Sequence, residues 1–199
     1  MISELIGSRI RGYTLRLGEV LARLGLTPNA VTTIGLILNV LVAAIIARGD
    51  LALGGILLLL ASGFDMLDGA VARASGAVTK FGGFLDSTID RYSEAIVYGG
   101  VLIYVLNGSD YRLGALLIFA ATTGSLLISY ARARAEAAGF RASVGLLARP
   151  ERVLVLAIGL LLGQPIAALW VLAIGTHLTV FTRMAHVWRI SRATGQSES

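Results

Sequence analysis

VLVLAIGLLLGQPIAALWVLAIGTHLTVFT, residues Val153–Thr182, is the stretch that decides the fold, and it contains no charged side chain. As one helix it would be about 45 Å long, whereas the hydrocarbon core of a bilayer is about 30 Å thick. Near its middle, Gly163-Gln164-Pro165 brings together residues that favour a turn. The stretch therefore predicts two membrane-crossing helices joined by a tight turn.

The composition of the whole chain agrees with a membrane protein. Of its 199 residues, 56% are apolar and 15% are charged, and the mean hydropathy is +0.79, whereas soluble domains carry about 25% charged residues. The length suits one domain. The lack of cysteine excludes disulfides, thiolate metal sites and a cysteine nucleophile. A net charge of +5 would also suit a nucleic-acid-binding protein, but not at this hydropathy, so we expect no nucleic-acid partner.

Four apolar segments precede this stretch and predict further helices. The first begins at Thr27-Pro28, where a capping hydroxyl is followed by proline at the first helical position. The segments run from Pro28 to Ala47, from Leu51 to the acidic residues after Phe64, from Phe81 to Leu106, and from Leu113 to Glu136. Together they predict an all-α integral membrane protein with six transmembrane helices in one domain, residues 26–192.

The two ends of the chain differ from this domain. In residues 1–25, apolar side chains recur every three or four positions and arginines occupy the other faces, which is typical of an amphipathic juxtamembrane helix among the lipid headgroups. The alternative is that this helix packs on another helix of the protein. It lacks the unbroken apolar stretch of a signal peptide. Residues 193–199 form a short polar tail, which we expect to be disordered.

Lys and Arg are unevenly distributed between the predicted loops. With six spans, 15 of the 17 fall on one side of the membrane, and Arg48 and Arg112 fall on the other. With five spans, the three arginines after Thr182 would be exported. Since cytoplasmic loops are enriched in Lys and Arg, we predict six spans in the cell (inner or plasma) membrane, with both termini in the cytoplasm.

Five of the 12 acidic residues lie between Asp65 and Glu94. Asp65 and Asp68 are three residues apart, and Asp86 and Asp90 are four apart, so each pair occupies one face of a helix. The helical rise places both pairs about 6–12 Å inside the cytoplasmic boundary. The pairs are therefore predicted to face each other in a site that opens to the cytoplasm. The sequence assigns no role to Glu94.

Four carboxylates at this depth need a counter-charge. Each costs about 2.5–3.5 kcal/mol if it is unpaired near the middle of a bilayer. One or two divalent cations would remove that cost, and carboxylate oxygens favour Mg²⁺ or Mn²⁺ over zinc. Ion pairs with Arg73, Lys80 or Arg91 are the alternative, but they would account for two of the acids and not for four. Gly69 would let a ligand approach the backbone, and Arg73 suits a phosphate beside the metals.

The acids belong to a specific string, DMLDGAVAR at 65–73 and, eight residues later, GGFLDSTID at 82–90. It resembles the signature of the CDP-alcohol phosphotransferases, D-x2-D-G-x2-A-R-x8-G-x3-D-x3-D, with every fixed position present. This family exchanges the CMP of a CDP-linked alcohol for a second alcohol and uses two divalent metals. The resemblance implies a six-helix core, an N-terminal juxtamembrane helix and a homodimer.

The resemblance also implies roles for individual residues. The metal ligands would be Asp65, Asp68, Asp86 and Asp90. Asp90 would in addition be the base that deprotonates the acceptor hydroxyl. The CDP group of the lipid would be held by Asn29, Ala30, Val31, Thr32, Gly69, Arg73 and Thr79.

Two basic segments bear on the acceptor. SYARARAE at 129–136 and ARPER at 148–152 resemble segments of the phosphatidylinositol phosphate synthases of actinobacteria and their archaeal counterparts. They place arginines on the side of the metal site, which suits a phosphorylated acceptor. We expect acceptor-phosphate contacts from Arg132, Arg152 and Arg189. The expected reaction transfers a phosphatidyl group from CDP-diacylglycerol to inositol 1-phosphate and releases phosphatidylinositol phosphate and CMP.

Several alternatives remain open at this stage. Glycerol 3-phosphate also presents a phosphate and a hydroxyl, and an archaeol-type donor would meet the same apolar surroundings. A cation or proton transporter would use intramembrane acids, although these lie in one layer near one surface. A lipid-binding scaffold would have no need of Asp90. A homodimer interface would be permitted by the small residues Gly99, Gly100, Gly114 and Gly124.

Overall fold

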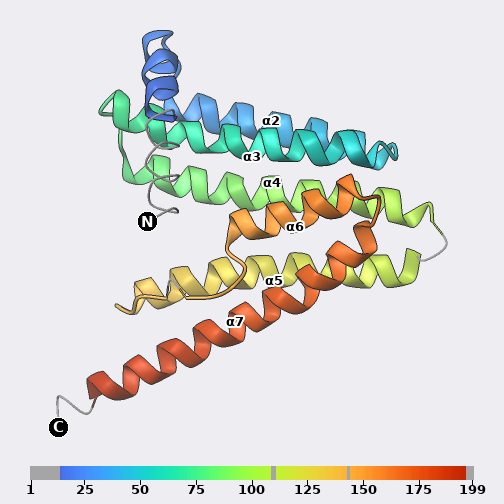
Figure 1. Ribbon diagram of the computed structural model, residues 1–199. Helices are drawn as coiled ribbons and strands as arrows, with labels where there is room; N and C mark the ends of the chain where they lie inside the picture. Colours follow the sequence, from blue (N-terminus) through green and yellow to red (C-terminus); the bar gives the residue numbers. More distant parts are fainter. Residues whose placement is uncertain (1–13, 109–110, 143, 196–199) are drawn as a thin grey trace, which may run out of the picture.

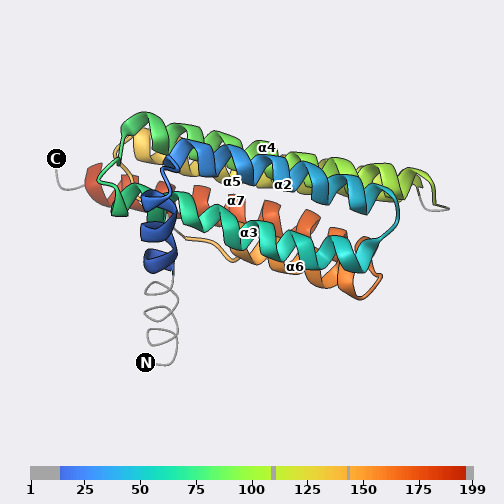
Figure 2. The same cartoon turned by 90° about the horizontal axis from the view of Figure 1, so that it is seen from above.

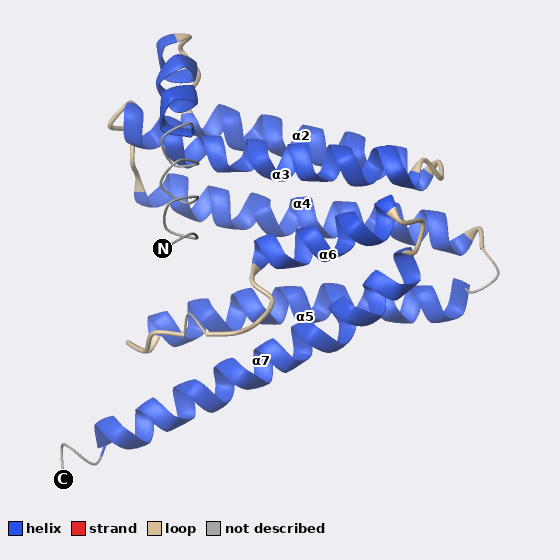
Figure 3. Ribbon diagram, viewed as in Figure 1, coloured by secondary structure: helices blue, strands red, loops and turns tan. Residues whose placement is uncertain are grey.

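The computed structural model describes residues 14–108, 111–142 and 144–195, and this part of the chain is helical, with connecting loops and no strand (Figures 1 and 3). A first helix covers residues 14–23. The others are α2 (Pro28–Ala47), α3 (Leu51–Ala74), α4 (Lys80–Leu106), α5 (Tyr111–Ala137), α6 (Arg149–Leu161) and α7 (Pro165–Gly195). The predicted all-α class is confirmed, and α2 and α4 match their predicted bounds to within one residue.

Local sequence determines where these helices begin and end. The Thr27 hydroxyl accepts a hydrogen bond from the backbone N–H of Ala30 at 3.2 Å and so caps the first turn of α2. Gly163 turns the chain between α6 and α7 with a φ of +64°, a conformation that favours glycine. Pro165 then begins α7. The predicted interruption of the 153–182 stretch is therefore a tight turn.

The six longer helices form one bundle in which each packs on two neighbours, in the closed cycle α2–α3–α6–α7–α5–α4. They run side by side, and α7 crosses the others obliquely (Figures 1 and 2). The fully buried side chains at the centre include Ile46, Val101, Leu160 and Leu169. Because α2 contacts both α3 and α4, it holds together the two helices that carry the acidic pairs.

Four of the helices are long and apolar enough to cross a membrane: α2, α3, α5 and residues Pro165–Ala193 of α7. α4 is long enough, but every 18-residue window of it contains Asp90, Arg91 and Glu94. α6 has only 13 residues, about 20 Å against a hydrocarbon core of about 30 Å. Of the six predicted spans, these criteria therefore support four.

α6 is short because the loop that connects it to α5 enters the bundle. The backbone N–H of Leu147 donates to the Thr179 hydroxyl at 3.3 Å, and Nε of Arg183 donates to the carbonyl of Val144 at 2.8 Å. Non-helical backbone at membrane depth requires such partners within the protein. α6 therefore begins part-way along the bundle rather than at its end (Figure 1).

The described part of the predicted juxtamembrane helix, residues 14–23, stands across one end of the bundle (Figure 2). A side chain on Gly18 would lie 2.7–2.9 Å from atoms of Ala70, so this helix packs directly on α3. Leu17 and Leu24 nevertheless remain 52% and 73% exposed. The structure thus shows packing on α3 together with exposed leucines, and the position of this helix among the lipid headgroups stays a prediction.

The remaining terminal predictions fall partly outside the described chain. Residues 1–13 of the predicted amphipathic helix and residues 196–199 of the predicted tail lie outside it. The tail prediction is wrong for its first three residues, because α7 continues as a helix to Gly195.

Three of the four glycines proposed for a dimer interface are used within the chain. A side chain on Gly100 would collide with the Ala43 backbone of α2, one on Gly114 with Val105 of α4, and one on Gly124 with Thr176 of α7. A side chain on Gly99 would begin in open space, with no atom of the described residues within 4 Å beyond its own helix. Close helix approach inside one bundle is therefore the role of Gly100, Gly114 and Gly124, which corrects their sequence-based interpretation.

The neighbouring glycines of α4 give a matched test of this packing. Gly100→Ala should destabilise the protein by about 1–3 kcal/mol, the usual cost of overpacking a tight contact. Gly99→Ala adds the same methyl group to open space and should be neutral or stabilising, since alanine favours helix by about 1 kcal/mol over glycine. The measurement is the midpoint of thermal unfolding in detergent. Equal shifts for the two variants would contradict the packing described here.

Candidate active site

The acidic pairs lie within helices and not at their ends. α3 continues through Asp65 and Asp68 to Ala74, and α4 carries Asp86 and Asp90 in its first three turns. Asp68 and Asp86 line one cavity, and a single guanidinium, that of Arg149, contacts both Asp65 and Asp90. The predicted facing of the two pairs is therefore present in the structure.

Asp68 is the most buried of the four aspartates, with 9% of its surface exposed. The Thr32 hydroxyl of α2 donates to one of its carboxylate oxygens at 2.9 Å, and the backbone N–H of Gly69 donates to the other. α2 thus orients a carboxylate of α3, and the tertiary contact explains why Thr32 belongs to the site.

Arg149, the first residue of α6, bridges Asp65 and Asp90. Its Nη2 lies 2.7 Å from Oδ2 of Asp65, and its Nη1 lies 2.7 Å from Oδ1 of Asp90. The sequence interpretation quoted Arg149 only as part of the ARPER segment and gave it no role. The sequence does show that Arg149 is followed by proline, as at a helix start, and that it lies three residues before Arg152. It does not show how deep in the bundle α6 begins.

The donor set fits a hard divalent cation. The four carboxylates offer only oxygen ligands, from opposite sides of one site. Among the described residues, no three His, Asp or Glu side chains are arranged as a ligand group around one point. The Arg149 guanidinium instead contacts one oxygen of Asp65 and one of Asp90.

A cavity of about 350 Å³ adjoins Asp68 and Asp86. It is lined by residues of α2, α3 and the start of α4, including Asn29, Thr32, Gly69, Arg73, Thr79 and Gly82. Five of the seven residues predicted to hold the CDP group therefore come together. Ala30 and Val31 do not line the cavity, and Val31 is fully buried in the bundle. Of residues 29–32, only Asn29 and Thr32 share a face of α2, because they are three residues apart on the helix.

A smaller cavity of about 100 Å³ adjoins Asp90 and is basic. Its lining residues come from α4, α5, α6 and α7 and include Asp90, Glu94, Ser129, Arg132, Arg149, Arg152 and Arg183. Arg132 is exposed and pairs with Glu136 at 2.8 Å. Arg189 is exposed and does not line this cavity. Arg183, six residues earlier on α7, does line it.

Arg152 is buried in the interior of the protein. Only 3% of it is exposed. Its Nε and Nη2 donate to the two carboxylate oxygens of Glu94 at 2.7 and 2.8 Å, and its Nη1 donates to the carbonyl of Leu147 at 3.1 Å. In this structure Arg152 therefore makes a bidentate pair with Glu94, a residue to which the sequence assigned no role.

The chain belongs to the CDP-alcohol phosphatidyltransferase family, whose model matches residues 25–181. It is therefore an enzyme, a transferase of phospholipid biosynthesis, and the transporter and scaffold alternatives are set aside. The chain is 38% identical over 188 residues to a phosphatidylinositol phosphate synthase of Mycobacterium marinum, covering 89% of this chain and 80% of that one. It is also 38% identical over 185 residues to an archaetidylinositol phosphate synthase of Pyrococcus horikoshii, covering 92% and 95%.

Solved structures agree with this assignment. The phosphatidylinositol phosphate synthase of Mycobacterium tuberculosis superimposes with a TM-score of 0.82 at 34% identity. The match to its crystal structure with manganese and citrate covers 88% of this chain and 88% of the mycobacterial chain. The match to its crystal structure with CDP-DAG bound covers 88% of this chain and 93% of the mycobacterial chain. The family uses divalent metals, so the predicted Mg²⁺ or Mn²⁺ dependence is confirmed as a divalent-metal requirement.

The pair of Arg152 and Glu94 gives a stability prediction. Arg152→Gln or Glu94→Gln should each destabilise the protein by about 3–5 kcal/mol, because each leaves one buried charge without a partner. The double variant should lose less than the sum of the two. The measurement is again thermal unfolding in detergent. Arg132→Gln is the matched control and should have little effect, because its pair with Glu136 is exposed; additive losses in the double variant would contradict the pairing.

Proposed function

We propose that this enzyme transfers the phosphatidyl group of CDP-diacylglycerol to a hydroxyl of inositol 1-phosphate, giving phosphatidylinositol phosphate and CMP. The observation that carries the proposal is that three of the aspartates line two cavities of different character. Asp68 and Asp86 line the larger one, and Asp90 lines the basic one. The relatives at 38% identity bear names of inositol phosphate synthases, which supports the same acceptor here.

The larger cavity is the proposed site of the CDP group. Asn29 and Thr79 offer polar side chains, and Thr79 caps α4 by accepting from the backbone N–H of Gly82 at 2.9 Å. The Arg73 guanidinium lies 3.3 Å from where a side chain on Gly69 would begin. Because Gly69 has no side chain, there is room for the pyrophosphate beside the Arg73 guanidinium. The planar, forked donors of a guanidinium suit phosphate oxygens.

The four aspartates are the proposed ligands of two divalent ions per site. When bound, such ions would neutralise the pyrophosphate and polarise the attacked phosphorus. Thr32 holds Asp68 in position by its 2.9 Å hydrogen bond. Asp65 comes within reach once its oxygen is free of Arg149. A pyrophosphate in the larger cavity would lie against Asp68 and Asp86, which line it.

Asp90 is the proposed base. It is the aspartate that lines the basic cavity, where the acceptor would stand. The acceptor hydroxyl would give its proton to Asp90 as its oxygen attacks the phosphatidyl phosphorus. A new oxygen–phosphorus bond forms while the bond from that phosphorus to CMP breaks, and CMP leaves with the electron pair.

The basic cavity is the proposed acceptor site. Arg132, Arg149 and Arg183 converge on it, and arginine recognises phosphate by paired, charge-assisted hydrogen bonds. Arg183 is fixed by donating to the carbonyls of Ile128 and Val144 at 2.6 and 2.8 Å. We therefore keep Arg132 from the sequence-based set and replace Arg152 and Arg189 by Arg149 and Arg183.

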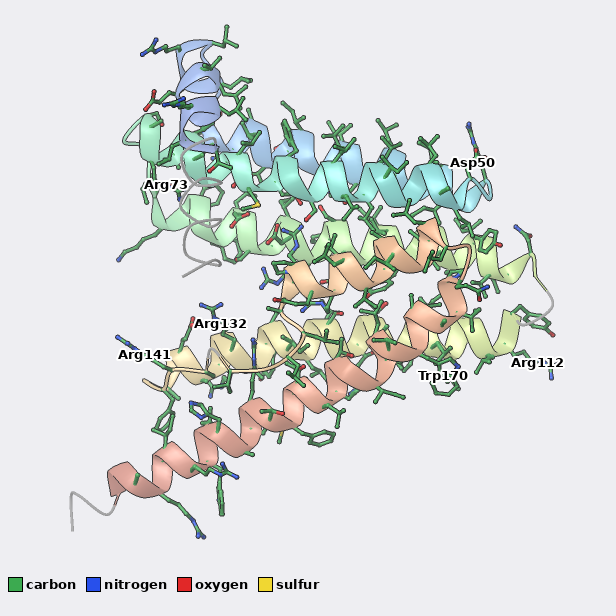
Figure 4. All side chains as sticks on the ribbon, in the orientation of Figure 1. Asp50, Arg73, Arg112, Arg132, Arg141 and Trp170 are labelled. Atoms are coloured by element: carbon green, nitrogen blue, oxygen red, sulfur yellow. The ribbon has the colours of Figure 1, made fainter. Side chains whose placement is uncertain are left out.

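We further propose that all six helices from α2 to α7 are embedded in the membrane and that the chain forms a homodimer. Arg73, Arg132 and Arg141 lie at one end of the bundle, whereas Asp50 and Arg112 lie at the other (Figure 4). By the positive-inside rule, the first end faces the cytoplasm. The open surface of α4 around Gly99 is available to a second copy.

The test is CMP release by purified protein in lipid with Mg²⁺ and CDP-diacylglycerol. Inositol 1-phosphate, free inositol and glycerol 3-phosphate are offered separately, and CDP-archaeol is tried as a second donor. We expect turnover with inositol 1-phosphate alone among the acceptors, and its loss on chelation of divalent ions. Asp90→Asn should lower the rate by about 10²–10⁴-fold, the usual contribution of a general base.

Two outcomes would overturn parts of this proposal. Turnover with glycerol 3-phosphate but not with inositol 1-phosphate would contradict the acceptor. Full activity of Asp90→Asn would contradict the base. Circular dichroism and elution in detergent control for folding of the variant.

A further inference from the structure

Two arginines at the start of α6 stand in contrasting environments. Arg152 is 3% exposed, and its Nε, Nη1 and Nη2 all donate hydrogen bonds. The Arg149 side chain is 27% exposed, and its Nη1 and Nη2 each meet one carboxylate oxygen. Its Nε is buried without a hydrogen-bond partner among the described residues. Arg152 is therefore a fixed structural cation, whereas only two carboxylates hold Arg149.

Those two carboxylates belong to Asp65 and Asp90, which are also proposed metal ligands. Asp90 faces guanidinium groups with both oxygens, since Oδ1 lies 2.7 Å from Arg149 and Oδ2 lies 3.9 Å from Arg91. A divalent cation and the Arg149 guanidinium would thus use the same oxygens. Because like charges repel at this distance, binding of the cation must weaken or break the arginine contacts.

The Arg149 side chain adjoins two cavities. Its side chain forms part of the wall between a narrow cavity beside Asp65 and the basic cavity that contains Ser129, Arg132 and Arg183. If the Arg149 side chain turned from the narrow cavity toward the basic cavity, its two Nη groups and its unpaired Nε would be exposed to a ligand there. A guanidinium with free donors binds phosphate by parallel hydrogen bonds.

We propose that Arg149 is an exchangeable counterion that couples the two halves of the reaction. It neutralises Asp65 and Asp90 until a divalent cation takes them, and the released guanidinium then completes the phosphate site of the basic cavity. The second half rests on the proposed function of that cavity. The consequence is that divalent cation and acceptor phosphate bind with positive coupling, and that this coupling is reciprocal.

The first experiment measures Mn²⁺ binding by electron paramagnetic resonance, using the purified protein in detergent with no substrate. Arg149→Gln should bind Mn²⁺ more tightly by about 5–150-fold, the usual range of coupling between linked events. Arg91→Gln is the matched control, because it removes the same charge near Asp90 from a longer, more exposed pair. It should cause a clearly smaller change. Unchanged or weaker Mn²⁺ binding in Arg149→Gln, or equal gains in both variants, would overturn the proposal.

The second experiment uses the wild-type chain, so that it does not depend on a variant that folds. Mn²⁺ affinity is measured with and without inositol 1-phosphate or glycerol 3-phosphate, with protein-free blanks for binding of Mn²⁺ to each ester. Either ester should tighten Mn²⁺ binding, since both carry the phosphate that would hold Arg149. Arg149→Lys should show a reduced effect, because one ammonium group lacks the paired donors of a guanidinium. Independence of Mn²⁺ and both esters would overturn the coupling.

These readouts separate this proposal from the proposed function. Mn²⁺ affinity without substrate reports only on competition for Asp65 and Asp90. A failure of CMP release with inositol 1-phosphate would contradict the proposed acceptor and leave that binding result unaffected. Normal turnover together with Mn²⁺ affinity that is insensitive to Arg149→Gln would contradict the counterion role alone.

Discussion

Neutralising four carboxylates inside an apolar bundle is the constraint on which the rest of the structure depends. The aspartates of α3 and α4 face each other at a depth where an unpaired charge is costly. In the structure, Arg149 bridges Asp65 and Asp90, and the Thr32 hydroxyl and the Gly69 N–H satisfy Asp68. Each partner comes from outside the acidic pairs, so the site requires α2, α3, α4 and α6 to be in place together.

Buried arginines, like the buried carboxylates, have partners on other helices. The loop between α5 and α6 enters the bundle, and its backbone is held by Thr179 and Arg183 of α7. α6 can then begin at the level of the aspartates and bring Arg149 and Arg152 with it. Glu94 neutralises Arg152 and keeps it fixed. Glu94 thereby helps to hold the helix that supplies the bridging arginine.

Two cavities adjoin the aspartates. One of about 350 Å³ is lined by Asp68 and Asp86, and a basic one of about 100 Å³ is lined by Asp90. Glycines of the bundle permit this arrangement, since Gly100 and Gly124 bring α4 against α2 and α5 against α7. Membership of the CDP-alcohol phosphatidyltransferase family agrees with a site built to join a lipid-linked donor to a second alcohol.

Much of this protein could be predicted from the sequence, because the decisive signals are local. Helix bounds follow from apolar runs, capping threonines, Gly163 and Pro165, and the i, i+3 and i, i+4 spacings put each acidic pair on one face. The same helical geometry left Ala30 and Val31 outside the cavity, although they adjoin Asn29 and Thr32.

Only the tertiary structure decided how the arginines are used. Arg149, Arg152 and Arg183 carry the same charge, and their roles depend on which carboxylate or carbonyl each one meets across the bundle. Those partners lie 39 to 84 residues away along the chain. Helical periodicity relates residues within one helix and carries no information on contacts between helices, and the entry of a loop into the bundle cannot be read from composition.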